Sequence, residues 1–492
     1  MSNRIEPAFS DSGKDPWHNC LRAGVGKREI TNREPGVAVA DPLYARALVL
    51  HNGLTQVVII AMDVTAIGGR AISDGMLPDI GEEFLPALRE EIETELGIPG
   101  ANVLVNASHT HPPGCMLCND QEQVQRTLAA VQQAFAELQP VKVGATLGKE
   151  ERVAMNRTLR LKNGRDWTIR HSIPSPPPDQ ICGSGPLDNS VGIIRFDRLD
   201  GTPLALIFNF ACHPLFGNYD GSLTANFPGE AARILEQELG SNSVALFLQG
   251  AAGDVCDVTF KDFQQQRNAA VLGKYLAESV LAAQRNLVTR PVELKVVPEE
   301  IFLPRRADIP DRIERLKTEQ ESLLHSLRFC SLNFELFLQL YLQQKENQIA
   351  GTDSSPMHSF NRKNIEKYLS NLRVMEALSK IQDDIATLEK HAAINARAGG
   401  ALIPAEVMGI RLGDCVLITA PLEALTEIGL DVKRDSPFPH TFLSAYTNGY
   451  LHYGAPAEYY DRGGYEVTEC LLAPEWQQIY QKAVRKIFDQ LQ

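Results

Sequence analysis

The sequence predicts an α/β fold, with a mixed β-sheet core flanked by helices and a long helical hairpin inserted into it. Between residues 20 and 290, short apolar runs alternate with helical patterns, an order typical of α/β proteins. Residues 306–399 differ, because they are rich in Leu, Gln, Glu and Lys with heptad-like spacing. We therefore expect a discontinuous α/β domain, 1–305 plus 400–492, interrupted by a helical hairpin at 306–399.

Apolar runs of strand length give the predicted strands, which are 47–52, 56–64, 102–108, 191–198, 203–211 and 243–250. Apolar residues at helical spacing predict helices at 85–96 and 121–137. A third helix is expected at 229–239, because Pro228 stands just before it and proline is common at helix starts. After the insertion, residues 407–421 and 440–450 return to strand character.

The inserted segment contains two heptad-like stretches separated by the turn-rich sequence GTDSSPMHSFN at 351–361. Each arm holds only about three to four heptads, which favours an intramolecular hairpin over a coiled-coil dimerisation arm. Homo-oligomer formation through this hairpin stays open.

Composition excludes several classes of protein. Hydrophobic residues make up 44% and charged residues 22%, an ordinary globular balance. The net charge of −13 argues against nucleic acid as a partner, since phosphate binding needs a basic surface. The N-terminus lacks an apolar signal region, and no apolar run approaches the roughly 20 residues of a membrane helix. We expect a cytoplasmic protein, without stable membrane insertion, whose nine cysteines are reduced.

The chemically informative residues follow the ends of predicted strands. Five strand ends carry such residues, namely His109 and His111, His213, Asp254, Glu423, and Tyr446 with Tyr450. In α/β sheets the carboxyl ends of strands form the edge at which ligands bind. The sequence therefore predicts that these side chains converge on one site.

Two imidazoles and a carboxylate are the ligands of a catalytic zinc ion, which keeps one position open for water or substrate. Such a metal would lower the pKa of water and polarise a carbonyl group. The spacing of His109 and His213 is long and irregular, unlike H-E-x-x-H, so the prediction depends on the whole set. Taken singly, either histidine would more often be a hydrogen-bonded core residue.

Other motifs predict less. The segment 24–28 (GVGKR) lacks the first glycine and the Ser/Thr of a phosphate-binding loop. Cys115 and Cys118 form a C-x-x-C without the second pair that a structural zinc would need. The chain has no G-x-S-x-G, which removes the commonest α/β-hydrolase interpretation. Whether a second metal lies near Asp63 stays open.

Several of these segments together resemble a known family. They are 23–31 (AGVGKREIT), 41–47 (DPLYARA), 106–114 (NASHTHPPG), 210–214 (FACHP), 253–255 (GDV) and 445–447 (AYT). The set is similar to the catalytic domain of neutral (non-lysosomal) ceramidases. The resemblance covers about 20–260 and, more loosely, 405–470. It does not extend to the helical segment.

The resemblance implies a zinc amidase that splits an N-acyl amide. The implied metal ligands are His109, His213, Glu423 and Tyr446, with Tyr450 as the alternative to Tyr446. His111 and Arg157 would stabilise the oxyanion or hold the substrate, and Asp254 would orient the turn at Gly253.

The chain departs from the family pattern at Cys256, where the family has a serine, and at Asp257, which follows it. Three hypotheses follow. In the first, which we favour, zinc-activated water attacks the substrate and Cys256 only lines the pocket. In the second, a Cys256 thiolate acts as the nucleophile of an acyl hydrolase or transferase. In the third, the chain is a non-catalytic ligand-binding descendant.

We also expect the chain to lack the family's C-terminal β-sandwich and any apolar, membrane-facing segment. Ceramide is a bilayer lipid, so an enzyme for it needs a surface that meets the membrane. We therefore expect a smaller or more soluble N-acyl amide or ester as the substrate.

Overall fold

The computed structural model describes residues 20–68, 80–111, 120–169, 176–216, 221–240, 242–257, 268–352 and 356–492. It divides into two compact units. The first comprises Met1–Thr168, Asp179–Arg305 and Ala398–Gln492, and the second comprises Ile169–Pro178 and Arg306–Arg397. The motif formed by Cys115 and Cys118 lies outside the described residues.

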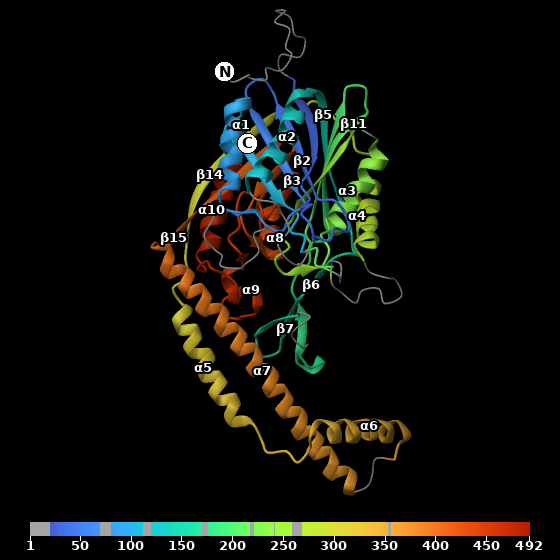
Figure 1. The fold of residues 1–492 in the computed structure, drawn as a ribbon, viewed down its shortest axis with the longest axis vertical. Helices are drawn as coiled ribbons and strands as arrows, with labels where there is room; N and C mark the ends of the chain where they lie inside the picture. The colour runs from blue at the N-terminus through green and yellow to red at the C-terminus, as the bar shows by residue number, and fades with distance from the viewer. Residues whose placement is uncertain are drawn as a thin grey trace, which may run out of the picture. The chain divides into compact units, whose positions relative to one another are not determined.

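An eight-stranded mixed sheet forms the centre of the first unit (Figure 1). In spatial order its strands are β12 (Val244–Gln249), β11 (Pro203–Phe210), β10 (Ser190–Arg198), β5 (Gln139–Lys149), β1 (Arg22–Glu29), β2 (Tyr44–His51), β3 (Gln56–Met62) and β4 (Val103–Ala107). The pairs β3–β4 and β11–β12 are parallel, and the other neighbours are antiparallel. Thus β12 and β4 are the two edge strands.

A second sheet packs against one face of the first. Its strands, in order, are β14 (Leu294–Pro304), β15 (Leu402–Leu412), β16 (Cys415–Thr419) and β18 (His440–Ser444). The two sheets share one apolar core, to which Ile59, Leu248, Leu417 and Phe442 belong. Alternating residues of each strand point to opposite faces, so the other faces remain for the helices.

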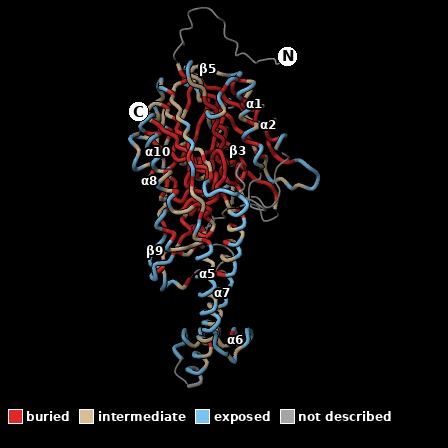
Figure 2. The backbone as a smooth tube through the Cα atoms, turned by 90° about the vertical axis from the view of Figure 1, so that its left-hand side faces the viewer, coloured by how far each residue is buried: buried red, intermediate tan, exposed pale blue. Residues whose placement is uncertain are grey.

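Helices cover the outer faces of both sheets. On the large sheet lie α1 (Phe84–Leu96), α2 (Asp120–Ala136), α3 (Asn226–Leu239) and α4 (Ala269–Gln284), and on the second sheet lie α8 (Thr426–Asp435) and α10 (Trp476–Leu491). The first unit is therefore layered as helices, sheet, sheet and helices, with buried residues in both sheets and on the helices that pack against them (Figure 2).

Small elements complete the first unit. The short strands are β6 (Met155–Asn156) with β13 (Val255–Cys256), β17 (Glu423–Ala424) with β19 (Tyr453–Gly454), and β7 (Thr158–Leu161) with β8 (Asp166–Thr168) and β9 (Ile181–Ser184). The short helices are η1 (Gly100–Asn102), η2 (Pro178–Gln180), η3 (Ala457–Tyr459) and α9 (Tyr465–Thr468).

The glycines of the segment GVGKR belong to strand β1 and serve packing. A Cβ atom on Gly24 would lie 1.9 Å from the carbonyl oxygen of Ala134, and one on Gly26 would lie 2.0 Å from that of Ala130. Both carbonyls belong to α2, which therefore packs closely on β1 because these residues have no side chain.

The six strands and three helices predicted between residues 47 and 250 are all present, with ends shifted by at most three residues. The predicted segment 407–421 is divided by a turn at Gly413, whose φ is 64°. In the predicted segment 440–450 only the first five residues form a strand.

The second unit contains three helices among its described residues, where the sequence predicted two arms. They are α5 (Ile309–Ser326), α6 (Phe334–Ala350) and α7 (Pro356–Ala398). Helix α6 was not predicted from the sequence. Its start is capped by the Asn333 side chain, which accepts a hydrogen bond from the Leu336 amide, and it ends at Gly351 in a left-handed conformation.

Helix α6 exposes apolar side chains, contrary to the expectation of no apolar exposed segment. Phe334, Leu342 and Ile349 are 59%, 54% and 89% exposed. Among the described helices, none combines the length and apolar character that a membrane crossing requires.

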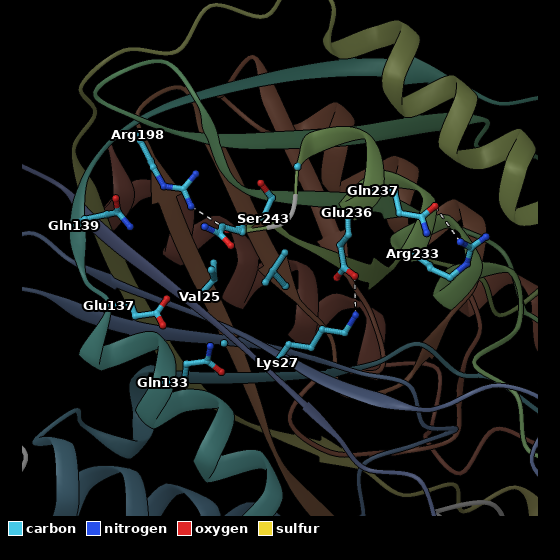
Figure 3. Close-up of a pocket in the computed structure, with 14 residues that line it drawn as sticks. Val25, Lys27, Gln133, Glu137, Gln139, Arg198, Arg233, Glu236, Gln237 and Ser243 are labelled. Atoms are coloured by element: carbon cyan, nitrogen blue, oxygen red, sulfur yellow. Dashed lines mark hydrogen bonds and ion pairs between the residues drawn. The ribbon is translucent and has the colours of Figure 1, made fainter.

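A polar surface pocket of about 860 Å³ lies between α2 and α3 (Figure 3). Glu236, one of the residues that line it, accepts hydrogen bonds from Lys27 at 2.6 Å and from buried Arg46 at 3.2 Å. Arg46 also donates to Asp63 at 2.8 Å. The Arg46 guanidinium thus balances the charge of the Asp63 carboxylate. Asp63 is the residue near which the sequence left a second metal site open.

Candidate metal centre and active site

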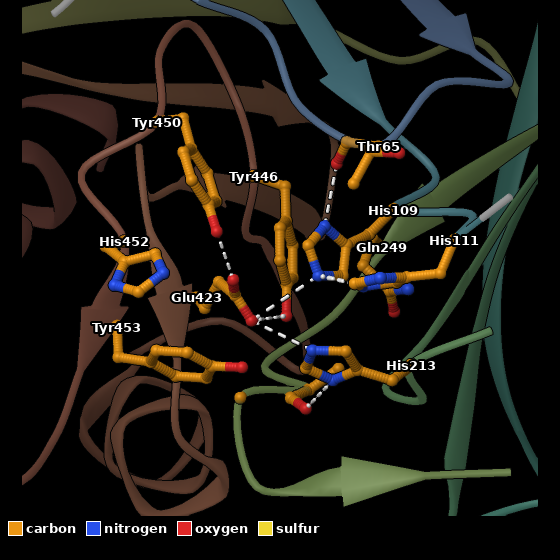
Figure 4. A network of polar contacts seen from close by, with 12 residues as sticks. Thr65, His109, His111, His213, Gln249, Glu423, Tyr446, Tyr450, His452 and Tyr453 are labelled. Carbon is orange, nitrogen blue, oxygen red and sulfur yellow. Dashed lines mark hydrogen bonds and ion pairs between the residues drawn. The ribbon is translucent and has the colours of Figure 1, made fainter. Parts of the chain in front are cut away.

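Three histidines from two strand ends converge in the first unit (Figure 4). His109 and His111 follow β4, and His213 follows β11. Their ligand nitrogens lie within 4.8 Å of one another. His109 and His213 are buried, and His111 is half-buried. The Nε2 atoms of His109 and His111 are 3.0 Å apart.

The carboxylate of Glu423 completes this group from β17 of the same unit. Its Oε2 atom lies 2.9 Å from His213 Nε2 and 3.4 Å from His109 Nε2. Hydrogen bonds from the Tyr446 and Tyr450 hydroxyls to its two oxygens favour the ionised form of the carboxylate.

Two tyrosines contact different oxygens of Glu423. The Tyr446 hydroxyl lies 3.4 Å from Oε2, the oxygen that also faces the histidines. The Tyr450 hydroxyl donates to Oε1, on the other side of the carboxylate. The Tyr446 hydroxyl therefore contacts the same Glu423 oxygen as the two histidines, and the Tyr450 hydroxyl does not. This favours Tyr446 over Tyr450 as a metal ligand.

The protonation of His213 shows that this group fits a cation. Its Nδ1 atom lies 2.5 Å from the carbonyl oxygen of Ala252 and 3.1 Å from that of Val255. Carbonyl oxygens only accept, so Nδ1 carries the proton and the Nε2 lone pair faces the Glu423 carboxylate. Burial and the positive charge of Arg157 lower the pKa of His213 to about 4, so a second proton is absent at neutral pH.

His109 has the same arrangement, because its Nδ1 atom lies 2.7 Å from the carbonyl oxygen of Thr65. The Nε2 lone pairs of both histidines, the Glu423 carboxylate and the Tyr446 hydroxyl therefore face one point. Zinc bonds of about 2.0–2.1 Å at tetrahedral angles place ligand atoms roughly 3.3–3.4 Å apart. The 3.4 Å between Glu423 and His109 matches this spacing, whereas the 2.9 Å between Glu423 and His213 is shorter than it.

Left-handed backbone conformations place two of these side chains. His109 has a φ of 63° and Tyr446 a φ of 53°. Such angles are uncommon for residues other than glycine and concentrate at functional sites. They turn the chain sharply after β4 and after β18, so that both aromatic rings face each other at 4.3 Å between centroids.

Arg157 is buried beside this group, in contact with acceptors of the chain. Its Nε atom donates to Glu466 at 2.8 Å, and its Nη2 atom donates to the carbonyl oxygen of Gly253 at 2.8 Å and to the Tyr453 hydroxyl at 3.0 Å. Burial lowers the pKa of Arg157, but Tyr453 and Glu466 raise it well above its ordinary value. The guanidinium is therefore held by three acceptors, and the ring of one of them, Tyr453, stacks on His213 with 6.5 Å between the ring centroids.

Asp254 and Cys256 belong to the turn that carries Gly253. The Asp254 carboxylate accepts hydrogen bonds from the Thr426 amide at 2.8 Å, the Thr426 hydroxyl at 2.7 Å and the Asn156 amide at 2.7 Å. It thereby ties the turn to the chain just after Glu423. Cys256 is buried, and its backbone pairs with His213 in a β-bridge.

Sequence reasoning missed Glu466, Tyr453 and Thr65. Glu466 lies more than 300 residues from Arg157 in the sequence, and Thr65 acts through its backbone carbonyl. Neither contact leaves a local signal in the sequence. Tyr453 could have been found, because it follows Tyr446 and Tyr450 in the same loop.

Comparisons with known proteins support one fold. No protein-family model matches the chain, and no curated protein matches its sequence. Solved structures match, among them a neutral ceramidase from Pseudomonas aeruginosa and a ceramidase complexed with C2. Each has a TM-score of 0.61 and 16% identity over 96% of this chain, and the matches cover 74% and 75% of those chains. The chain therefore has the fold of the neutral ceramidases.

Proposed function

We propose that the protein is a zinc-dependent hydrolase of an N-acyl amide bond. The observation that carries this proposal is the pair formed by His213 Nε2 and Glu423 Oε2, two acceptors 2.9 Å apart in a buried site. A cation between them would relieve the repulsion between the lone pair and the carboxylate. The fold of the neutral ceramidases supports the choice of an amide as the bond that is cut.

His109, His213, Glu423 and Tyr446 would hold the zinc ion. When bound there, zinc would polarise the acyl carbonyl and lower the pKa of water. The chain's own residues supply the remaining functions. Arg157 donates to the oxygen of the Tyr453 hydroxyl. The proton of that hydroxyl therefore does not point at Arg157, and it could donate to the acyl oxygen of a bound substrate.

His111 is suited to proton transfer. It is half-buried, its Nε2 atom lies 3.0 Å from that of His109, and burial lowers its pKa well below the ordinary value. In hydrolysis the oxygen of water bonds to the acyl carbon, the C–N bond breaks, and the leaving amine takes a proton. His111 can accept the proton of water and return it to the amine.

We propose a broader substrate class than the one expected from the sequence. The expectation of a small or soluble substrate depended on the lack of an apolar, membrane-facing segment. Helix α6 exposes Phe334, Leu342 and Ile349, so that argument no longer holds. We therefore propose N-acyl amides of either short or long chain, with esters of the same acyl groups as secondary substrates.

Metal analysis and turnover test the proposal together. The protein, purified without added metal, should contain about one zinc ion per chain and hydrolyse at least one member of an N-acyl amide panel. A chelator should abolish both. His213→Ala should lose zinc and turnover, whereas His51→Ala, a substitution at the end of β2, should keep both. A parent protein without zinc contradicts the proposal.

A Cys256-dependent acyl transfer is the second candidate. The observation that favours it is the place of Cys256 in the turn whose Gly253 carbonyl oxygen accepts a hydrogen bond from the Arg157 guanidinium. A nearby cation stabilises a thiolate. Loss of turnover in Cys256→Ala with zinc retained would support this candidate over the first.

A further inference from the structure

We infer that Gln249 is a positioning residue that sets the distance between the two metal-binding histidines; this inference rests on the proposed metal site. The side chain of Gln249 is fully buried at the end of β12. Its Nε2 atom donates to the carbonyl oxygen of Ser108 at 2.9 Å and to that of Cys212 at 2.9 Å. Ser108 precedes His109, and Cys212 precedes His213.

The fold needs such a link because the strand pairing of the sheet does not connect β4 with β12. His109 follows β4, one edge of the eight-stranded sheet, whereas Gln249 ends β12, the opposite edge. The two edges meet at the site, where the backbone N–H of Gln249 donates to Oδ1 of the Asn106 side chain in β4 at 3.0 Å. Side-chain amides thus join two edges that no described strand pairing connects.

The orientation of the Gln249 amide is fixed by its other atom. Its Oε1 atom accepts from the backbone amide of Cys212 at 3.2 Å and from that of Gly250 at 3.1 Å. A flipped amide would place its N–H groups against these donors and its oxygen against two carbonyls. One side chain therefore fixes Ser108 and Cys212 relative to each other, and with them the imidazoles that follow.

A second buried amide provides a matched control. Asn209 donates to the carbonyl oxygens of Leu248 and Leu443, both at 2.9 Å. It also joins backbones of different strands through two bonds, yet neither acceptor adjoins a metal-binding histidine. Gln249→Met and Asn209→Leu therefore each remove two donors from the core, but only the first releases the loops of His109 and His213.

The experiment measures zinc affinity of the full chain by chelator competition, with unfolding of the metal-free protein as the second measurement. We expect Gln249→Met to weaken zinc binding roughly 10–100-fold, as residues behind the ligands commonly do. Asn209→Leu should change zinc affinity little, although it should lower the unfolding midpoint by about as much as Gln249→Met does. Gln249→Asn keeps an amide but shortens its reach, and should weaken zinc binding even if Gln249→Met does not fold.

Two results would overturn the inference while leaving the proposed metal site intact. In the first, the parent binds zinc and the foldable Gln249 variants bind it equally well. In the second, the Gln249 variants and Asn209→Leu weaken zinc binding alike, so that affinity only follows stability. A parent that binds no zinc instead refutes the proposed function.

Discussion

His213 Nε2 and Glu423 Oε2 lie 2.9 Å apart, and no proton lies between them because His213 carries its proton on Nδ1. Glu423→Gln removes the negative charge that a cation would meet there. We expect zinc content to fall from about one ion per chain towards zero, measured by metal analysis. Glu427→Gln, four residues along the chain, is the control and should retain the metal.

The two tyrosines of the site should differ in effect. Tyr446 contacts the Glu423 oxygen that faces the histidines, whereas Tyr450 contacts the other oxygen. Tyr446→Phe should therefore weaken zinc affinity more than Tyr450→Phe, which removes a hydroxyl from the same loop. Chelator competition measures both. Equal losses would show that neither hydroxyl is a ligand or that both are.

Cys256→Ala separates the two candidate nucleophiles. If water is the nucleophile, kcat should stay within about an order of magnitude of the parent, because the thiol forms no bond to the substrate. If the thiolate attacks, turnover should disappear while zinc stays bound. Cys212→Ala, another buried thiol beside His213, controls for packing.

The ion pair of Arg157 and Glu466 should contribute strongly to stability. Both side chains are buried, and the Nε–Oε1 distance is 2.8 Å. Glu466→Gln leaves a buried guanidinium without its counter-charge, so the free energy of unfolding should fall by about 3–5 kcal/mol. In contrast, Glu427→Gln breaks the partly exposed pair with Arg160 and should cost about 0–1 kcal/mol. Urea denaturation compares the two variants.

The pH dependence of the metal-free protein should reveal His213. Burial and Arg157 lower its pKa to about 4, from an ordinary value of 6.5. Between these values the unfolded chain binds a proton that the folded chain does not, so folding stability is complete above pH 6.5 and falls as the pH drops towards 4. His213→Gln should reduce this slope of the unfolding free energy against pH. An unchanged slope would contradict the low pKa.

Much of the local structure could be predicted because it depends on short-range patterns. Buried strands such as β3 and β12 are apolar runs, and α2 has apolar residues at helical spacing. Helix α6 was missed because apolar residues occur on several of its sides, including the exposed one, so its periodicity is weak. Capping by Asn333 and the left-handed Gly351 define its ends instead.

For the candidate site, the sequence by itself determined which residues stand at strand ends, among them His109, His213 and Glu423. Their convergence was decided by tertiary structure, because it requires the edges β4 and β12 to meet and Gln249 to bridge them. Tertiary structure also decided which oxygen of Glu423 each tyrosine contacts. Such relations depend on hydrogen bonds between residues far apart in the chain, and local periodicity carries no information about those partners.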